Sequence, residues 1–249
     1  MYDFREFAPH LEELRSRLMA ILLVLFGTAA VALLDQKFYM KLVLIPHIQT
    51  MRTLNLANTI QVLHYEESFF AHLKVSLIAA LIFTTPFAFH QIWLFISEGL
   101  YQDEKRYVYI FLPIMLLLFV CGVLFGYFVL VPTGLLFLAS YNREMIHLGI
   151  TLSSYISLFF VLTFVSGIIF ELPLVMLILC KFGLVQTESY IENWRYSILV
   201  AFVCAAVLTP PDVVTQLLMA GPIITLYLTG ILLCRFTERL QTIKAFLNH

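Results

Sequence analysis

Long apolar runs separated by short polar segments dominate the hydrophobic pattern of this 249-residue chain. A helix that spans a bilayer needs about 20 mostly apolar residues, because the hydrocarbon offers its backbone groups no water to bond. Six runs reach or approach that length, covering residues 18–34, 72–97, 108–131, 155–180, 196–208 and 213–234. The pattern predicts an all-α integral membrane protein of six transmembrane helices that forms a single domain over residues 1–249.

Two stretches depart from simple spans. Residues 35–71 are too polar to cross a membrane, and within them residues 38–51 predict a short surface helix that is broken or kinked at Pro46. The fifth run, residues 196–208, would extend only about 20 Å, against about 30 Å of hydrocarbon. A turn at Pro210, Pro211 and Asp212 separates it from the sixth run, which Pro222 is expected to interrupt.

The distribution of Lys and Arg predicts the orientation of the spans. If the N-terminus is inside, the inner segments carry ten of these residues and the outer loops carry four, Lys37, Lys41, Arg52 and Arg143. Both termini are therefore expected in the cytoplasm. The two lysines lie close to the first span and weaken the asymmetry.

Composition supports the membrane assignment and limits the chemistry. The chain is 61% hydrophobic and 12% charged, whereas a soluble domain has about 25% charged residues. A net charge of -1 gives no general attraction for nucleic acid. The four cysteines lack metal-ligand spacing and are expected to be buried free thiols. No hydrolase, zinc or phosphate-binding motif occurs, so we expect no catalytic residue, metal or cofactor.

The N-terminal segment from Phe4 to Leu18 has the apolar spacing of an amphipathic helix beginning near Ala8. Glu13 and Arg17 lie four positions apart on its polar face. This spacing permits a simple ion pair, but it also permits a ligand site at the membrane surface.

The loop between the second and third spans, residues 97–106, lies on the same predicted membrane face and carries three carboxylates, including Glu104. Two acidic sites on one face would suit a dibasic ligand, because a carboxylate pairs with a guanidinium through two parallel hydrogen bonds. Alternatively, Lys105 and Arg106 could pair with these carboxylates within the loop and leave none of them for a ligand.

Glu171 is the most informative single residue, because it lies about 15 Å inside the fourth span. A charge at that depth costs about 2.5–3.5 kcal/mol on insertion scales, so it is expected to face the bundle interior, a partner or a wet cavity. The following Pro173 leaves a backbone carbonyl that needs another partner.

Five short motifs, in order along nearly the whole chain, are similar to those of the TatC family, the signal-peptide receptor of the twin-arginine protein translocase. They are His10-Leu11-Glu12-Glu13-Leu14-Arg15; Glu67-Ser68-Phe69-Phe70 with Lys74 and Ser76; Gln91-Ile92-Trp93-Leu94-Phe95 with Gly99-Leu100-Tyr101 and Glu104; Phe170-Glu171-Leu172-Pro173; and Leu208-Thr209-Pro210-Pro211-Asp212. The chain departs from the family at His64-Tyr65-Glu66, where a Thr-Pro or Ser-Pro pair is common.

The resemblance implies a cup-shaped bundle with short fifth and sixth helices. It implies that Glu13 and Glu104 bind the Arg-Arg motif of signal peptides on folded cargo, with Arg15, Arg17, Gln91 and Phe95 in the same site. The implied partners are single-span TatA- and TatB-type subunits, further copies of the chain and membrane lipid. Export across a bacterial inner membrane, or an organellar one, would use the proton-motive force and no catalysis by this chain.

Two other interpretations remain open from the residues. A small secondary transporter would use Glu171 as a proton-coupled site, although the two halves of the chain show no visible repeat. A structural membrane protein without a ligand is the other alternative.

Overall fold

The computed structural model describes the backbone of residues 4–56, 60–98, 102–140, 150–208 and 213–247. Side chains are described for residues 11–56, 60–96, 110–140, 150–208 and 213–239. Within these ranges the secondary structure is helical apart from one isolated parallel bridge between Gln61 and Thr151. The chain forms two compact units, which are described separately below. The single domain expected from the sequence stays a prediction.

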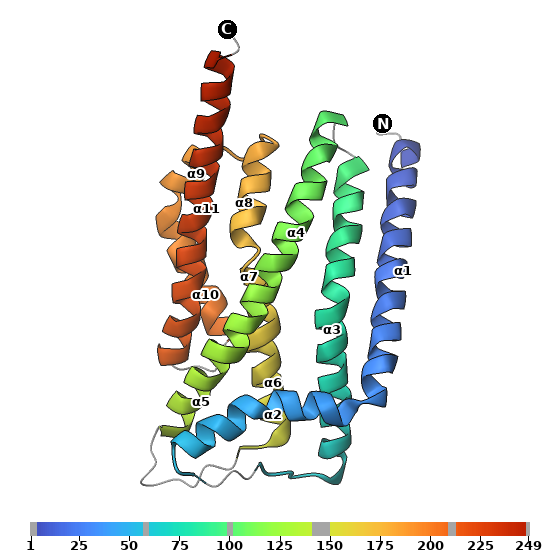
Figure 1. Cartoon of the computed structure of the whole chain (residues 1–249), viewed down its shortest axis with the longest axis vertical. Coiled ribbons are helices and arrows are strands. Elements are labelled where there is room, and N and C mark those ends of the chain that lie inside the picture. The colour runs from blue at the N-terminus through green and yellow to red at the C-terminus, as the bar shows by residue number, and fades with distance from the viewer. Residues whose placement is uncertain (1–3, 57–59, 99–101, 141–149, 209–212, 248–249) are drawn as a thin grey trace. The chain divides into compact units, whose positions relative to one another are not determined.

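The first unit is built on the antiparallel pair α1 (Phe4–Leu34) and α3 (Tyr65–Glu98), which lie side by side (Figure 1). Threonine hydroxyls join them midway, where Thr28 Oγ1 and Thr84 Oγ1 lie 2.9 Å apart. Small hydroxylated residues let two helices approach closely in a membrane and bond across the contact. The lipid-facing side of α1 stays apolar and exposed, as at Leu23 and Phe26.

Between these helices the chain forms α2 (Gln36–Thr53), which turns away from α1 and runs across its end (Figure 1). The buried face of α2 includes His47, whose ring centroid lies 5.2 Å from that of Tyr155. The Tyr155 hydroxyl donates a hydrogen bond to the carbonyl of Val43, which ties the start of α6 (Leu152–Phe160) to α2.

The second unit centres on a close crossing of two spans. The helix α4 (Gln102–Phe125) enters this unit at Leu118 and continues as η1 (Gly126–Leu130) and α5 (Val131–Ser140). The other span enters at Leu158 of α6 and continues as η2 (Val161–Val165), α7 (Ser166–Ile169) and α8 (Leu172–Lys181). Gly122 lets their backbones touch, because a Cβ there would lie 2.6 Å from the Ser166 carbonyl oxygen. The two π-helical turns, η1 and η2, pack against each other beside this contact.

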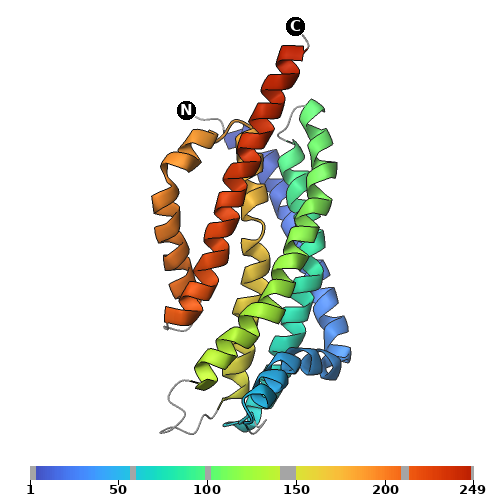
Figure 2. The ribbon, with the colours of Figure 1, turned by 60° about the vertical axis from the view of Figure 1, so that its left-hand side comes forward.

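The rest of the second unit is formed by α9 (Thr187–Glu192), α10 (Trp194–Leu208) and α11 (Val213–Leu247). Figure 2 shows α10 and α11 running alongside each other. Gln216 Nε2 donates to the carbonyl of Phe202 at 3.1 Å, and Thr187 Oγ1 donates to Glu238 Oε1 at 2.5 Å. These bonds attach α10 and α9 to the long α11.

Five helices in the described part of the chain are long and apolar enough to cross a membrane, and α10 is the shorter sixth apolar helix. The five long helices agree with five of the six predicted spans, and the count of six stays a prediction. At 15 residues, α10 extends about 22 Å and stays short of the hydrocarbon thickness.

Several local predictions differ from the structure. The first helix begins at Phe4 rather than near Ala8. The predicted break at Pro46 is absent, because α2 continues through this fully buried residue, while a kink there stays a prediction. Pro222 does not interrupt α11, whose 35 residues also contradict a short sixth helix. Of the four free cysteines only Cys234 is buried, because Cys121 and Cys204 lie on outward faces of their helices.

Candidate functional site

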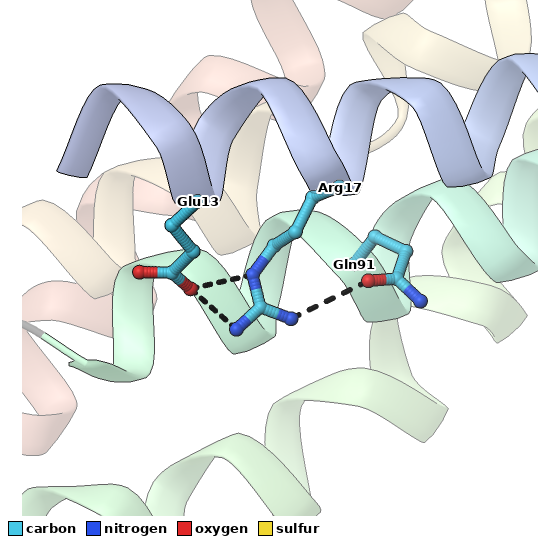
Figure 3. A network of polar contacts seen from close by, with 3 residues as sticks. All are labelled: Glu13, Arg17 and Gln91. Carbon is cyan, nitrogen blue, oxygen red and sulfur yellow. Dashed lines mark hydrogen bonds and ion pairs between the residues drawn. The ribbon is translucent and has the colours of Figure 1, made fainter. Parts of the chain in front are cut away.

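The polar face of α1 holds a three-residue network near its N-terminal end (Figure 3). Arg17 Nε donates to Glu13 Oε1 at 2.6 Å, and Arg17 Nη2 contacts the same oxygen. The four-residue spacing, with the acid nearer the N-terminus, is the favoured orientation for such a pair. The predicted ion pair is therefore present, and it engages the carboxylate expected to bind a ligand.

Gln91 extends this network to the neighbouring helix. Its Oε1 accepts a hydrogen bond of 3.4 Å from Arg17 Nη1, so α1 and α3 both contribute to the site (Figure 3). The side chains of Glu13 and Arg17 are only 18% and 19% exposed. Partial burial against α3 strengthens the charged contacts relative to a fully solvated pair.

Trp93 secures the part of α3 that carries Gln91. It is fully buried, stacks on Phe111 at 5.9 Å and donates its indole N–H to the sulfur of Met115 at 3.3 Å. Gln91 therefore faces α1, while Trp93, two positions on, faces α4. The sequence predicted Trp93 only as part of a family motif and not as an anchor, although a large aromatic residue inside a span is a signal for this role.

The other predicted binding residues are less closely associated. Arg15 is exposed on α1, and Phe95 is half-buried near the end of α3. Glu104 falls in the first turns of α4, but its side chain lies outside the described residues. The pairing of Glu13 with Glu104 stays a prediction. The predicted turn residues Pro210, Pro211 and Asp212 also lie outside the described part of the chain.

Glu171 occupies a separate position in the second unit, at the interruption between α7 and α8. Pro173 causes the interruption, because it has no N–H to donate to the carbonyl one turn earlier. The Glu171 side chain is 5% exposed, and neither carboxylate oxygen has a hydrogen-bond partner among the described residues. A buried carboxylate without a partner is costly, and the interior position predicted for it is confirmed.

Residues 9–222 match the family described as Sec-independent protein translocase protein (TatC). The chain belongs to the TatC family. It is 36% identical to the TatC protein of Campylobacter jejuni over 231 residues, which cover 92% of this chain and 94% of that protein. It is also 36% identical to TatC of Helicobacter pylori J99 over 235 residues, covering 94% and 91%.

Solved structures support the same assignment. A crystal structure described as the twin-arginine translocase receptor TatC superposes with a TM-score of 0.82 and 32% identity, covering 92% of this chain and 99% of that one. A second crystal structure of a TatC receptor, in the detergent DDM, gives a TM-score of 0.81. The TatC match includes Glu13, Gln91, Glu104 and Glu171. With its apolar helices and bacterial relatives, the chain is a multi-pass inner-membrane protein.

Proposed function

We propose that this protein is the receptor subunit of a twin-arginine translocase and binds the Arg-Arg motif of signal peptides on folded cargo. The Glu13 carboxylate carries the proposal, because Arg17 already presents Nε and Nη2 to it. A signal-peptide arginine offers the same planar donor fork, so it would compete with Arg17 for this acceptor.

Glu104 is the second proposed acceptor, at the start of α4. Arg17 and Gln91 would position Glu13, since both belong to its hydrogen-bonded network. Phe95 would contact an apolar residue of the peptide, and Arg15 would contact its backbone carbonyls. With both termini in the cytoplasm, this site opens to the compartment in which cargo folds.

The test is a comparison of two peptides that differ only in carrying Arg-Arg or Lys-Lys. A lysine ammonium cannot form the paired hydrogen bonds of a guanidinium, so the Lys-Lys peptide should bind more weakly at equal charge. Replacing both carboxylates, as Glu13→Gln/Glu104→Gln, should weaken Arg-Arg binding about ten- to hundredfold, from a loss of about 1.5–3 kcal/mol. Salt lowers the effect where the site is exposed.

Glu12→Gln is the matched control, because Glu12 adjoins Glu13 but is exposed. It should leave both affinities nearly unchanged. Affinity is measured by fluorescence anisotropy of labelled peptides with the purified protein in detergent. A double variant that prefers Arg-Arg as strongly as the wild type does would show that these glutamates do not read the motif.

We infer that single-span TatA- and TatB-type subunits and further copies of the chain complete the translocase, and that this subunit performs no catalysis. The outward face of α10 supports a role in assembly or in thinning the bilayer. Leu199, Val200, Val203 and Val207 are all more than half exposed on this short helix. A helix of about 22 Å needs a thinner bilayer or a partner helix beside it.

Spin labels placed singly along Ile198–Leu208 test this part of the proposal. Their accessibility to oxygen and to a polar relaxation agent gives the depth of each position in the bilayer. A thinned or partner-bridged membrane predicts polar access at both ends of α10. A depth profile of full bilayer thickness around the purified protein alone would overturn it.

A further inference from the structure

One face of α2 is left uncovered by the described part of the protein. Phe38, Leu42 and Ile45 are 52%, 40% and 36% exposed, and their spacing of four and three positions places them on one stripe of the helix. The opposite face, with Met40, Val43 and His47, is buried. The helix therefore has two apolar faces, and only one of them packs inside the first unit.

Two lysines border this exposed apolar stripe. Lys37 and Lys41 are exposed and lie one helical turn apart, with about 5–6 Å between their Cβ atoms. Gln36–Thr53 contains no Asp or Glu, and no described residue forms an ion pair with either lysine. Asp35, just before the helix, is the acidic residue nearest to them in the sequence, and it forms no ion pair with either lysine. The uncovered face thus combines an apolar stripe with two cations that make no ion pair with a described residue.

The location of α2 places this face at the membrane. The helix begins two residues after Leu34, which ends the first span and is 87% exposed. Tyr39 makes an edge contact with Phe83 of α3, at 6.4 Å between centroids, and Phe83 is itself 62% exposed on the lipid-facing side of a span. The start of α2 therefore lies against a lipid-exposed surface, crosswise to α1 (Figure 1).

We propose that the face formed by Lys37, Phe38, Lys41, Leu42 and Ile45 binds anionic phospholipid in the leaflet where α2 lies. Interfacial helices bury their apolar residues at the boundary between headgroups and acyl chains. Lysine stems reach along such a surface and hold their ammonium groups at the level of the phosphates. This face also accounts for two of the four basic residues that the outer segments carry against the usual charge asymmetry.

The expected preference is measurable. A lysine near an anionic membrane surface contributes about a fivefold preference, so the two together contribute about thirtyfold at low salt. The preference falls as salt increases, because the charges are exposed. The inference is independent of signal-peptide binding, which is proposed on a different part of the first unit.

The experiment uses the full chain in vesicles that mix phosphatidylcholine with phosphatidylglycerol. A cysteine replaces Leu42 in a background where the four native cysteines are alanine, and it carries a bimane fluorophore. In parallel samples either the anionic or the zwitterionic lipid is brominated, so that the ratio of quenching reports which lipid lies against α2. The same fluorophore at Leu23, exposed in the middle of the first span, gives the reference ratio for bulk lipid.

We expect anionic lipid to quench the Leu42 probe more strongly than the Leu23 reference. Lys37→Gln/Lys41→Gln should bring the ratio to the reference value, and Lys37→Arg/Lys41→Arg should preserve the preference. A wild-type ratio equal to the reference at low salt would overturn the proposal. Absence of quenching by either lipid, with cross-linking through position 42, would show instead that protein covers this face.

A competition experiment with inorganic phosphate distinguishes binding of a lipid surface from binding of the free anion. At equal ionic strength, phosphate and chloride should reduce the preference equally if lipid is the ligand. A markedly stronger effect of phosphate would overturn the lipid assignment and indicate a site for the free anion.

Discussion

Glu67 accepts a hydrogen bond from the backbone N–H of Ser153, with 2.9 Å between Oε1 and the nitrogen, although the two residues are 86 positions apart. Its other carboxylate oxygen accepts the N–H of Leu63 at 2.7 Å. One side chain therefore satisfies a donor just before α3 and a donor in the first turn of α6. Both helix N-termini favour a negative charge. Lys74 adds a bond of 3.2 Å to the Ser153 hydroxyl.

Replacing this carboxylate should loosen the connection between residues 61–67 and α6. Glu67→Ala should increase amide hydrogen exchange at Leu63 and Ser153 and weaken the adjacent bridge of Gln61 with Thr151. Exchange is followed by mass spectrometry of the protein in detergent. Glu66→Ala is the control, because Glu66 is exposed beside it. Equal exchange in the two variants would mean that the Glu67 bonds contribute nothing to order here.

The glycine crossing of the second unit should not tolerate even one methyl group. A Cβ on Gly122 would lie 2.6 Å from a backbone oxygen and 2.8 Å from the Gly167 Cα, and neither can move without shifting a helix. Gly122→Ala should lower the free energy of unfolding by about 1–3 kcal/mol. Gly27→Ala adds the same methyl where nothing lies within 4 Å. Unfolding in detergent should distinguish the two variants, and matching stabilities would contradict the close contact.

His47 should make stability depend on pH. Burial lowers the pKa of its imidazole from the ordinary value of 6.5, so the unfolded chain binds a proton more readily. Stability should therefore fall as the pH drops below about 6.5. Melting temperatures of the wild type and of His47→Phe, which keeps a ring against Tyr155, should diverge between about pH 8 and about pH 5.

His90→Gln, at an exposed histidine, should retain the wild-type pH dependence. If His47→Phe shows the same slope as the wild type, then His47 does not titrate in this range in a way that couples to unfolding.

Glu171 should act in translocation or partner contact and not in cargo recognition. Glu171→Gln should leave Arg-Arg peptide binding largely unchanged while export falls. Glu171→Leu should also fold, because removing the charge relieves a membrane cost of about 2.5–3.5 kcal/mol. Export is measured in cells with a folded reporter protein, and Glu188→Gln, at an exposed glutamate, is the control. Full export by both Glu171 variants would assign the residue no role in transport.

The elements that sequence reasoning predicted correctly depend on local physics. Bilayer thickness sets the length of the apolar runs, so five long spans and a short α10 followed from counting residues. Helix geometry sets which residues are neighbours four positions apart, so the pair of Glu13 with Arg17 was predictable as well. An interior position was predictable for Glu171 because placing a charged residue in hydrocarbon costs free energy.

Tertiary structure decided which helix faces meet. The spacing of Gly122 and Gly126 is typical of close helix packing. Only the fold selects the backbone of Ser166 and Gly167 as the surface beside Gly122, and that of Leu162 and Thr163 as the surface beside Gly126. Glu67 finds Ser153 far along the chain in the same way.

By itself, the sequence determined the spans, the polar pair on α1 and the interior glutamate, because helix periodicity and the bilayer act on short segments. Only the tertiary structure decided that α2 and α11 continue through Pro46 and Pro222 and that His47 is buried. It also decided that the described residues leave the face of α2 with Lys37 and Lys41 exposed. Each of these depends on packing against residues distant in the chain, which no local pattern specifies.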